Sequence, residues 1–141
     1  MIQSLHIFTR AIFIRAFALV LISFPAQAAE RLGAEEFDTL TRSKTFYFGR
    51  AGKLYGGEQY LEGREVLWSF LDGNCKRGRW YEEGGMICFV YEDRPEPQCW
   101  SFEARAGGLV ARYENNPEAS ELYEVEQNPK PLYCKGPAVG G

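Results

Sequence analysis

Histidine is almost missing from this sequence of 141 residues, and His6 is the only one. Its side chain is the usual general base near neutral pH and the commonest ligand for transition metals. If residues 1–28 are removed, as predicted below, no histidine remains, which excludes Ser-His-Asp and Cys-His catalytic sites within the chain. We therefore expect a protein that is not an enzyme, binds no metal and uses no cofactor.

Clusters of Lys and Arg are lacking too. Without the two arginines of residues 1–28, 14 basic residues stand against 19 acidic ones, a net charge of −5. An acidic chain without a basic stripe has little attraction for nucleic acid or anionic lipid. The expected partner is therefore a small ligand or another envelope protein, of unknown identity.

The sequence has no uncharged apolar run of about 20 residues, the length that a transmembrane helix needs. Its apolar stretch, residues 16–24, follows Arg10 and Arg15 and ends in Pro-Ala-Gln-Ala. A basic start, a short apolar segment and small residues at the end are typical of a secretory signal peptide. We predict cleavage near Ala28 and a periplasmic or secreted protein without stable membrane insertion. The alternative is a membrane anchor, if cleavage fails.

Cys-x-x-Cys pairs, which a zinc site built from four thiolates would favour, are also absent. The four cysteines are instead separated by 12, 10 and 34 residues. An even number of cysteines in an exported chain indicates two disulfides, and four cysteines allow three connectivities. They are Cys75, Cys88, Cys99 and Cys134.

Short runs of aromatic and β-branched residues alternate with turns that contain Gly, Asn, Asp or Pro, as in an antiparallel meander. The predicted strands are residues 45–49, 54–61, 65–70, 75–82, 86–91, 98–104, 109–114 and 121–127. A short helix over residues 33–41 precedes them, with Phe37 and Leu40 on one face. We predict one domain over residues 29–141, with a core at 32–127 and a proline-bearing tail at 128–141.

Eight short strands in so few residues favour a mainly β fold, a meander that is barrel-like or strongly curled. An open sheet with the helix across one face is the alternative. If residues around the loop at Asp93 pair so that their numbers sum to 187, Ile87 faces Trp100 and Cys88 faces Cys99. Cross-strand neighbours lie at a distance that suits a disulfide. By elimination Cys75 pairs with Cys134 and fastens the tail.

Part of this pattern resembles a known group of sequences. It consists of a cysteine (Cys75), Gly78-Arg-Trp80, Ile87-Cys-Phe-Val-Tyr91 and Cys99-Trp100. The pattern resembles small exported alphaproteobacterial proteins that form a domain family of unknown function, and it covers roughly residues 32–134. The resemblance implies export and architecture and says nothing about chemistry.

Aromatic residues are the candidates for a ligand site, because such sites combine rings with a few polar groups. Those predicted to bind a ligand are Trp68, Trp80, Trp100, Tyr60 and Tyr91, and Tyr47 and Tyr55 are further candidates. The alternative for all of them is ordinary core packing. Gly56 and Gly57 within a predicted strand indicate a bulge or a close approach of the chain. Arg64 and Arg79 could meet an anionic ligand, or be merely solvated.

Acidic residues gather in two loops beside the strand at 86–91. Glu82, Glu83, Glu92, Asp93 and Glu96 could serve acid–base chemistry on glycans or bind Ca²⁺, or could form a solvated acidic rim. Our first hypothesis is a non-catalytic periplasmic binding or interaction domain, with protease inhibition as one possibility by analogy of fold. The alternatives are a carboxylate-dependent hydrolase acting on envelope glycans and a structural envelope component without a ligand.

Overall fold

The computed structural model describes residues 29–135. The predicted signal peptide and the last six residues lie outside this range. The described elements are α1 (Ala34–Thr41), β1 (Lys44–Arg50), β2 (Lys53–Tyr60), the 3-10 turn η1 (Glu62–Arg64), β3 (Glu65–Ser69), β4 (Cys75–Glu83), β5 (Met86–Tyr91), β6 (Arg94–Arg105), β7 (Gly108–Tyr113) and β8 (Leu122–Asn128). No helix among these residues has the length and apolar character needed to cross a bilayer.

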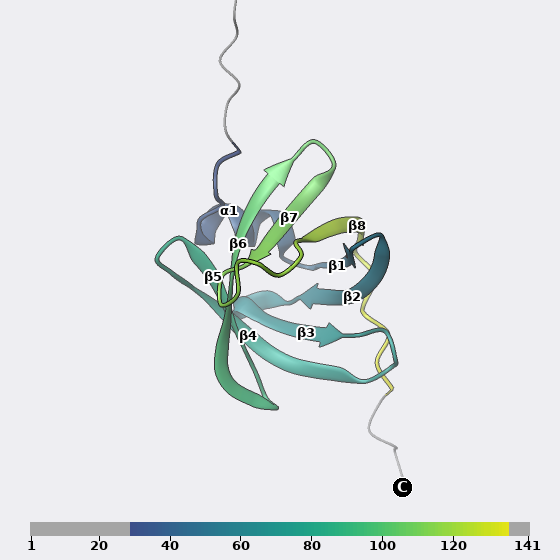
Figure 1. The fold of residues 1–141 in the computed structure, drawn as a ribbon. Coiled ribbons are helices and arrows are strands. Elements are labelled where there is room, and N and C mark those ends of the chain that lie inside the picture. The colour runs from purple at the N-terminus through teal and green to yellow at the C-terminus, as the bar shows by residue number, and fades with distance from the viewer. Residues whose placement is uncertain (1–28, 136–141) are drawn as a thin grey trace, which may run out of the picture.

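The eight strands form a closed antiparallel barrel in which each strand pairs with the next and β8 returns to β1 (Figure 1). The predicted mainly β meander is thus confirmed, and the open sheet is wrong. Closure is possible because β8 has two partners, with five residue pairs to β1 and two to β7. A closed barrel leaves no unpaired edge strand on which another chain could add.

The predicted register between β5 and β6 is confirmed: Ile87 faces Trp100 and Cys88 faces Cys99. The predicted start of the sixth strand at residue 98 is wrong, because β6 already begins at Arg94. Pro95 and Pro97 lie within this strand, and both side chains are exposed. An exposed strand end tolerates proline, since its missing N–H group leaves no partner unsatisfied in the sheet.

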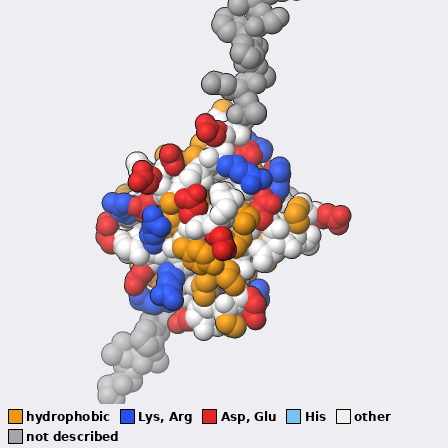
Figure 2. Space-filling view, turned by 90° about the vertical axis from the view of Figure 1, so that its left-hand side faces the viewer, with side chains coloured by type: hydrophobic (Ala, Val, Ile, Leu, Met, Phe, Trp, Pro, Cys, Tyr) orange, Lys and Arg blue, Asp and Glu red, His pale blue; other side chains and the backbone are white. Residues whose placement is uncertain are grey.

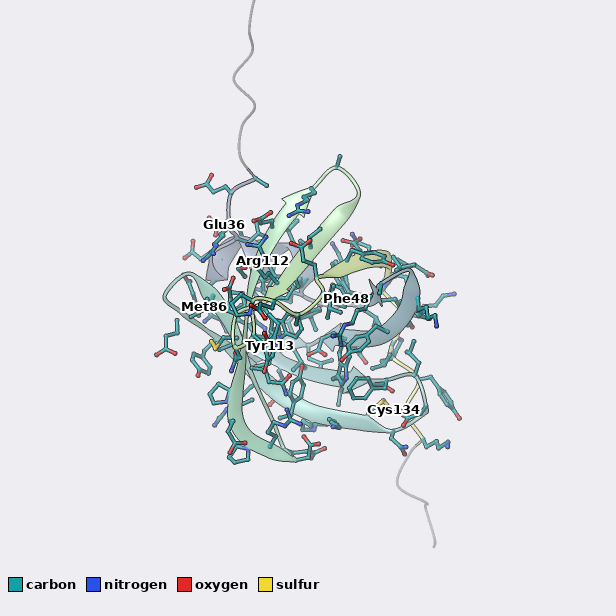
Figure 3. All side chains as sticks on the ribbon, viewed as in Figure 1. Glu36, Phe48, Met86, Arg112, Tyr113 and Cys134 are labelled. Carbon is teal, nitrogen blue, oxygen red and sulfur yellow. A yellow bond between two sulfur atoms is a disulfide. The ribbon has the colours of Figure 1, made fainter. Side chains whose placement is uncertain are left out.

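Both predicted disulfides are present, Cys88–Cys99 between β5 and β6 and Cys75–Cys134 between β4 and the tail. Disulfides of this kind are characteristic of proteins in oxidising compartments outside the cytoplasm. Leu132 is buried, and its N–H donates to the Gln59 side chain at 3.0 Å. Cys134, labelled in Figure 3, is thereby held close to the turn between β3 and β4.

Helix α1 closes one end of the barrel. The Phe37 side chain is fully buried, and its ring lies against the rings of Tyr60, Trp80 and Phe102 at centroid distances of 5.4, 5.1 and 4.5 Å. Of the two residues predicted to lie on one face of the helix, Phe37 is buried but Leu40 is 38% exposed, and Thr41 is the second buried residue of α1. Side chains at positions i and i+4 of a helix point in more similar directions than those at i and i+3. Thr41 therefore lies closer to the direction of Phe37 than Leu40 does.

The barrel interior follows from strand alternation, because successive side chains point to opposite faces. In β5, Ile87, Phe89 and Tyr91 lie on one face, and Phe89 and Tyr91 stack with centroids 6.2 Å apart. The outer surface carries charges of both signs, and Figure 2 shows one face on which they surround a group of hydrophobic side chains.

Candidate functional site

The end of the barrel opposite α1 is hollow. A cavity of about 400 Å³ opens there, among the hairpin ends β1–β2, β3–β4 and β5–β6 and the segment between β7 and β8. It is lined by Arg50, Tyr55, Trp68, Phe70, Lys76, Tyr91, Asp93, Arg94, Gln98, Trp100, Tyr113, Asn116, Ala119, Ser120 and Leu122. We call it the outer cavity. Its volume falls in the range of cavities that hold small organic ligands.

A second, inner cavity of about 30 Å³ lies deeper in the barrel. It is lined by Phe48, Glu58, Tyr60, Trp68, Phe89, Tyr91, Trp100, Phe102, Ala111 and Leu122. Four of these residues also line the outer cavity, so the two spaces adjoin. Tyr60 and Phe102 in turn contact Phe37 of α1, which places the inner cavity between the helix and the outer cavity. Phe48 of the inner wall and Tyr113 of the outer wall are labelled in Figure 3.

Glu58 is the only acidic residue that lines the inner cavity. It lies in β2, where Gly56, Glu58 and Tyr60 alternate with outward-facing residues, and it pairs with Phe46 of β1 and Trp68 of β3. The residue is 2% exposed. A carboxyl group is rarely buried to this extent unless it is paired.

The Glu58 carboxyl group is only half satisfied. Its Oε1 atom accepts a hydrogen bond from the Tyr91 hydroxyl at 2.9 Å, whereas its Oε2 atom is buried without a hydrogen-bond partner among the described residues. Burial raises the pKa of Glu58 well above its ordinary value of 4.5, and the bond from Tyr91 opposes this only in part. The ligand-free protein therefore holds Glu58 in its neutral form over a range of pH in which an exposed glutamate is charged.

Aromatic rings make up most of the wall that the two cavities share. Trp68 is packed edge-on against Phe70, with centroids 5.4 Å apart, and lies 5.9 Å from Tyr55. Trp100 lies 4.7 Å from Tyr113 on the other side. Gly56 makes room for Trp68, because a Cβ atom at this position would lie 2.3 Å from the indole ring.

The predicted bulge is present beside this glycine. Phe48 pairs with Gly56 and Gly49 pairs with Leu54, which leaves Tyr55 as an extra residue in β2. Bulges bend a strand and redirect the side chains next to them. The bulge and the close approach at Gly56 together set the position of Trp68 and Tyr55 at the cavity wall.

The outer rim is basic, although the chain as a whole is acidic. Arg50, Lys76 and Arg94 line the outer cavity together with a single acid, Asp93. Lys76 pairs with Asp93 at 2.6 Å, and its hydrogen bond and charge lower the pKa of that carboxyl group. Arg50 lies over the Tyr55 ring at 5.4 Å. The rim thus offers positive charge to a ligand on a protein that otherwise repels anions.

The structure brings together most of the aromatic residues predicted from the sequence. Trp68, Trp100 and Tyr91 line both cavities, Tyr60 lines the inner one, and Tyr55 lines the outer one. Trp80 lies elsewhere, packed against Phe37 in the core with the Arg64 guanidinium over its ring at 4.7 Å. Tyr47 and Arg79 line neither cavity.

The acidic residues that the sequence suggested do not form a group. Glu82 Oε2 accepts the Ala34 N–H at the start of α1, at 2.8 Å, and Glu92 Oε1 accepts the Arg77 N–H at 3.0 Å. Of the five candidates only Asp93 lines a cavity, while Glu83 and Glu96 are exposed. The hydrolase hypothesis requires at least two of Glu82, Glu92 and Asp93 in a cavity beside Trp80 or Trp100, and of these three only Asp93 lines a cavity.

Sequence reasoning missed Glu58 and the basic rim. The sequence does contain an indication of Glu58, because strand alternation places this acidic residue on the same inward face as Gly56 and Tyr60. The rim residues come from four different strands or turns, and only closure of the barrel brings them together. In residues 29–135 no three potential metal-ligating side chains are grouped as a metal site would require.

Comparison of the chain with protein-family models, with curated proteins and with solved structures gives no match. The resemblance to exported alphaproteobacterial proteins therefore stays a prediction.

Proposed function

We propose that this protein is a non-catalytic, exported binding protein that holds a small ligand in the open end of its barrel. The observation that carries this proposal is the outer cavity, a space of about 400 Å³ with aromatic walls and charged groups at its rim. Rings supply apolar contact area, and a few polar groups fix the orientation of a ligand.

The construction of the barrel supports the proposal. A barrel filled with its own side chains would serve a structural role, but here the side chains of the open end surround a space instead. Helix α1 closes the other end, and two disulfides hold the walls together. A site on a rigid frame loses little conformational freedom when it binds, which favours affinity.

Export is the second part of the proposal. Two disulfides suit an oxidising compartment, and we propose that residues 1–28 act as a signal peptide that is removed after Ala28. The N-terminal sequence of the protein recovered from a periplasmic fraction tests this, and we expect it to begin at Ala29. Recovery of the uncleaved chain in the membrane fraction would contradict it.

Occupation of the outer cavity can be tested with anilinonaphthalene sulfonate, a fluorescent probe that combines rings with an anionic group. We expect saturable binding of one probe per protein, because the rings can lie against Trp68 and Trp100 while the sulfonate meets Arg50 or Arg94. The variant Ala119→Trp places a large ring at the cavity wall and should weaken binding by about tenfold or more.

The matched control is Glu118→Trp, which adds the same ring at an exposed neighbouring position that lines neither cavity. It should leave probe binding unchanged. Equal binding by both variants and the original protein would contradict the proposal, provided that all three unfold cooperatively, since this probe also binds loosely packed states.

A further inference from the structure

Glu58 lies where a ligand in the outer cavity would end. The inner cavity adjoins the outer one through their shared wall of Trp68, Tyr91 and Trp100. A ligand that extends inward past these rings meets the Glu58 carboxyl group, whose Oε2 atom is buried and unpartnered. Such an atom is costly to leave unpaired, so a ligand group that satisfies it gains affinity.

The surroundings of Glu58 favour a positively charged group. Seven of the ten residues that line the inner cavity are aromatic, and the faces of aromatic rings attract cations. Among the described residues no Lys or Arg pairs with Glu58, so the protein does not itself supply the cation that a buried carboxylate needs.

The size of the inner cavity restricts what this group can be. At about 30 Å³ it has room for a group the size of a water molecule or two. A primary ammonium group has this size and carries three hydrogen-bond donors. A trimethylammonium group is too large for this space.

The basic rim indicates the other end of the ligand. Arg50 and Arg94 line the outer cavity, and neither forms an ion pair among the described residues. An anionic group at the mouth would complement them. A ligand with an amine at one end and an anion at the other therefore matches the charges along the whole depth of the site.

We propose, as an extension of the proposed function, that the ligand is a small primary amine whose ammonium group enters the inner cavity and pairs with Glu58, while an anionic group at its far end meets the basic rim. Glu58 is then the residue that determines specificity. The pairing also involves a proton, because a neutral carboxyl group must lose its proton to become the counter-ion of an ammonium group.

The other ionisable groups near Glu58 do not replace it in this role. Tyr91 and Tyr60 are both buried, and burial together with the charge of Glu58 raises the pKa of each phenol well above its ordinary value. Both hydroxyls therefore remain neutral. Asp93 and Glu124 act only at longer range, through their effects on Tyr91 and Tyr60 respectively.

Three probes with the same skeleton test the proposal by calorimetry at pH 7: 2-phenylethylamine, 2-phenylethanol and 3-phenylpropionate. We expect the amine to bind about tenfold or more tightly than either of the others. Glu58→Gln should weaken amine binding by about 10- to 100-fold and leave 2-phenylethanol nearly unchanged. Glu118→Gln removes an exposed charge at the same end of the barrel and should change neither affinity.

Proton release gives a second measurement, independent of affinity. Titrations in two buffers that differ in ionisation enthalpy should show net proton release when the original protein binds the amine, and none with Glu58→Gln. If Glu58→Gln does not fold, Tyr91→Phe replaces it, because loss of the hydroxyl removes the hydrogen bond that favours the charged carboxylate. That variant should lower amine affinity about three- to tenfold.

The outcomes separate this inference from the proposed function. Equal affinity for the amine and the alcohol, or amine binding without proton release, would overturn the role of Glu58. If Ala119→Trp still blocked anilinonaphthalene sulfonate, the binding cavity itself would stand. Failure of that probe to respond to Ala119→Trp would overturn both.

Discussion

Two residues of β2, Gly56 and Glu58, show how single positions shape the cavity. Both face the interior, at positions where the other strands place large apolar side chains. Gly56 has no side chain, so that Trp68 can occupy the space beside it. Glu58 places a carboxyl group where packing alone would favour an apolar one. Gly56 thus permits close packing of Trp68, whereas the buried carboxyl group of Glu58 costs stability.

The first prediction at this scale concerns Gly56→Ala. The added methyl group would lie 2.3 Å from the Trp68 ring and 2.8 Å from the Ser69 carbonyl oxygen, so the ring must move. We expect a loss of about 1–3 kcal/mol in unfolding free energy, as in other overpacked sites. Urea unfolding measures it, and a shift in tryptophan emission should accompany it.

Gly107→Ala is the control for this substitution. A Cβ atom at Gly107 would have no neighbour within 4 Å, and this residue has no positive φ. The unfolding free energy of this variant should differ from that of the original protein by less than about 0.5 kcal/mol. Equal effects of the two substitutions would show that the Gly56–Trp68 approach is not as close as described.

The second prediction is that Glu58 makes stability fall as pH rises. Its pKa is raised in the folded protein, so from about pH 4.5 upward the folded protein retains a proton that the unfolded chain has lost. Compared with Glu58→Gln, the original protein should lose up to about 1.4 kcal/mol of unfolding free energy per pH unit, until the pH reaches the folded pKa.

Urea unfolding of both proteins at pH 5, 6 and 7 measures this difference. The pKa values of Asp72 and Asp93 are lowered, so those carboxyl groups act in the opposite direction and at lower pH. They are common to both proteins and cancel in the comparison. A difference that stays constant or grows in favour of the original protein as pH rises would contradict a buried, neutral Glu58.

At the scale of elements, alternation and turn residues were enough to predict the strands. Strand β5 shows why: its inward positions are Ile87, Phe89 and Tyr91, and the Cys88–Cys99 pair fits only one register with β6. Strand ends were harder to predict, because prolines normally indicate a loop, whereas the exposed start of β6 accommodates Pro95 and Pro97. The helix was placed correctly, but its buried face depends on how it crosses the barrel end, which local sequence does not encode.

The third prediction concerns the two disulfides. Their sequence separations are 59 residues for Cys75–Cys134 and 11 for Cys88–Cys99. In the chain-entropy description a longer loop stabilises more, about 4 kcal/mol against about 3 kcal/mol. Replacing Cys75 and Cys134 by serine should therefore lower the unfolding free energy more than replacing Cys88 and Cys99.

Each double variant is compared with the original protein by urea unfolding. The Cys75–Cys134 variant should in addition expose the tail to protease around Leu132, because only hydrogen bonds and the packing of Leu132 would then hold it. These bonds run from the Thr45 hydroxyl to the Lys130 carbonyl, from the Leu132 N–H to Gln59 and from the Lys135 N–H to the Gly73 carbonyl. A greater loss for the Cys88–Cys99 variant would indicate that the tail contributes little to holding the barrel closed.

At the scale of the whole molecule, the cavity exists because the barrel is closed by a helix at one end only. The position of the cavity could not be predicted from the properties of individual residues, because it depends on how the whole barrel closes. The tryptophans were all candidates, but Trp68 and Trp100 face the open end while Trp80 lies under Phe37. Arg50 and Arg94 approach the same space only because β8 returns to β1 and completes the ring of strands.

The three tryptophans allow a direct test of whether the open end of the barrel binds a small ligand. The indole N–H signals of Trp68, Trp80 and Trp100 can be followed by two-dimensional NMR while anilinonaphthalene sulfonate is added. We expect the signals of Trp68 and Trp100 to shift and saturate together, whereas that of Trp80 stays in place. A shift of the Trp80 signal alone, equal shifts of all three, or no shift at all would contradict this expectation.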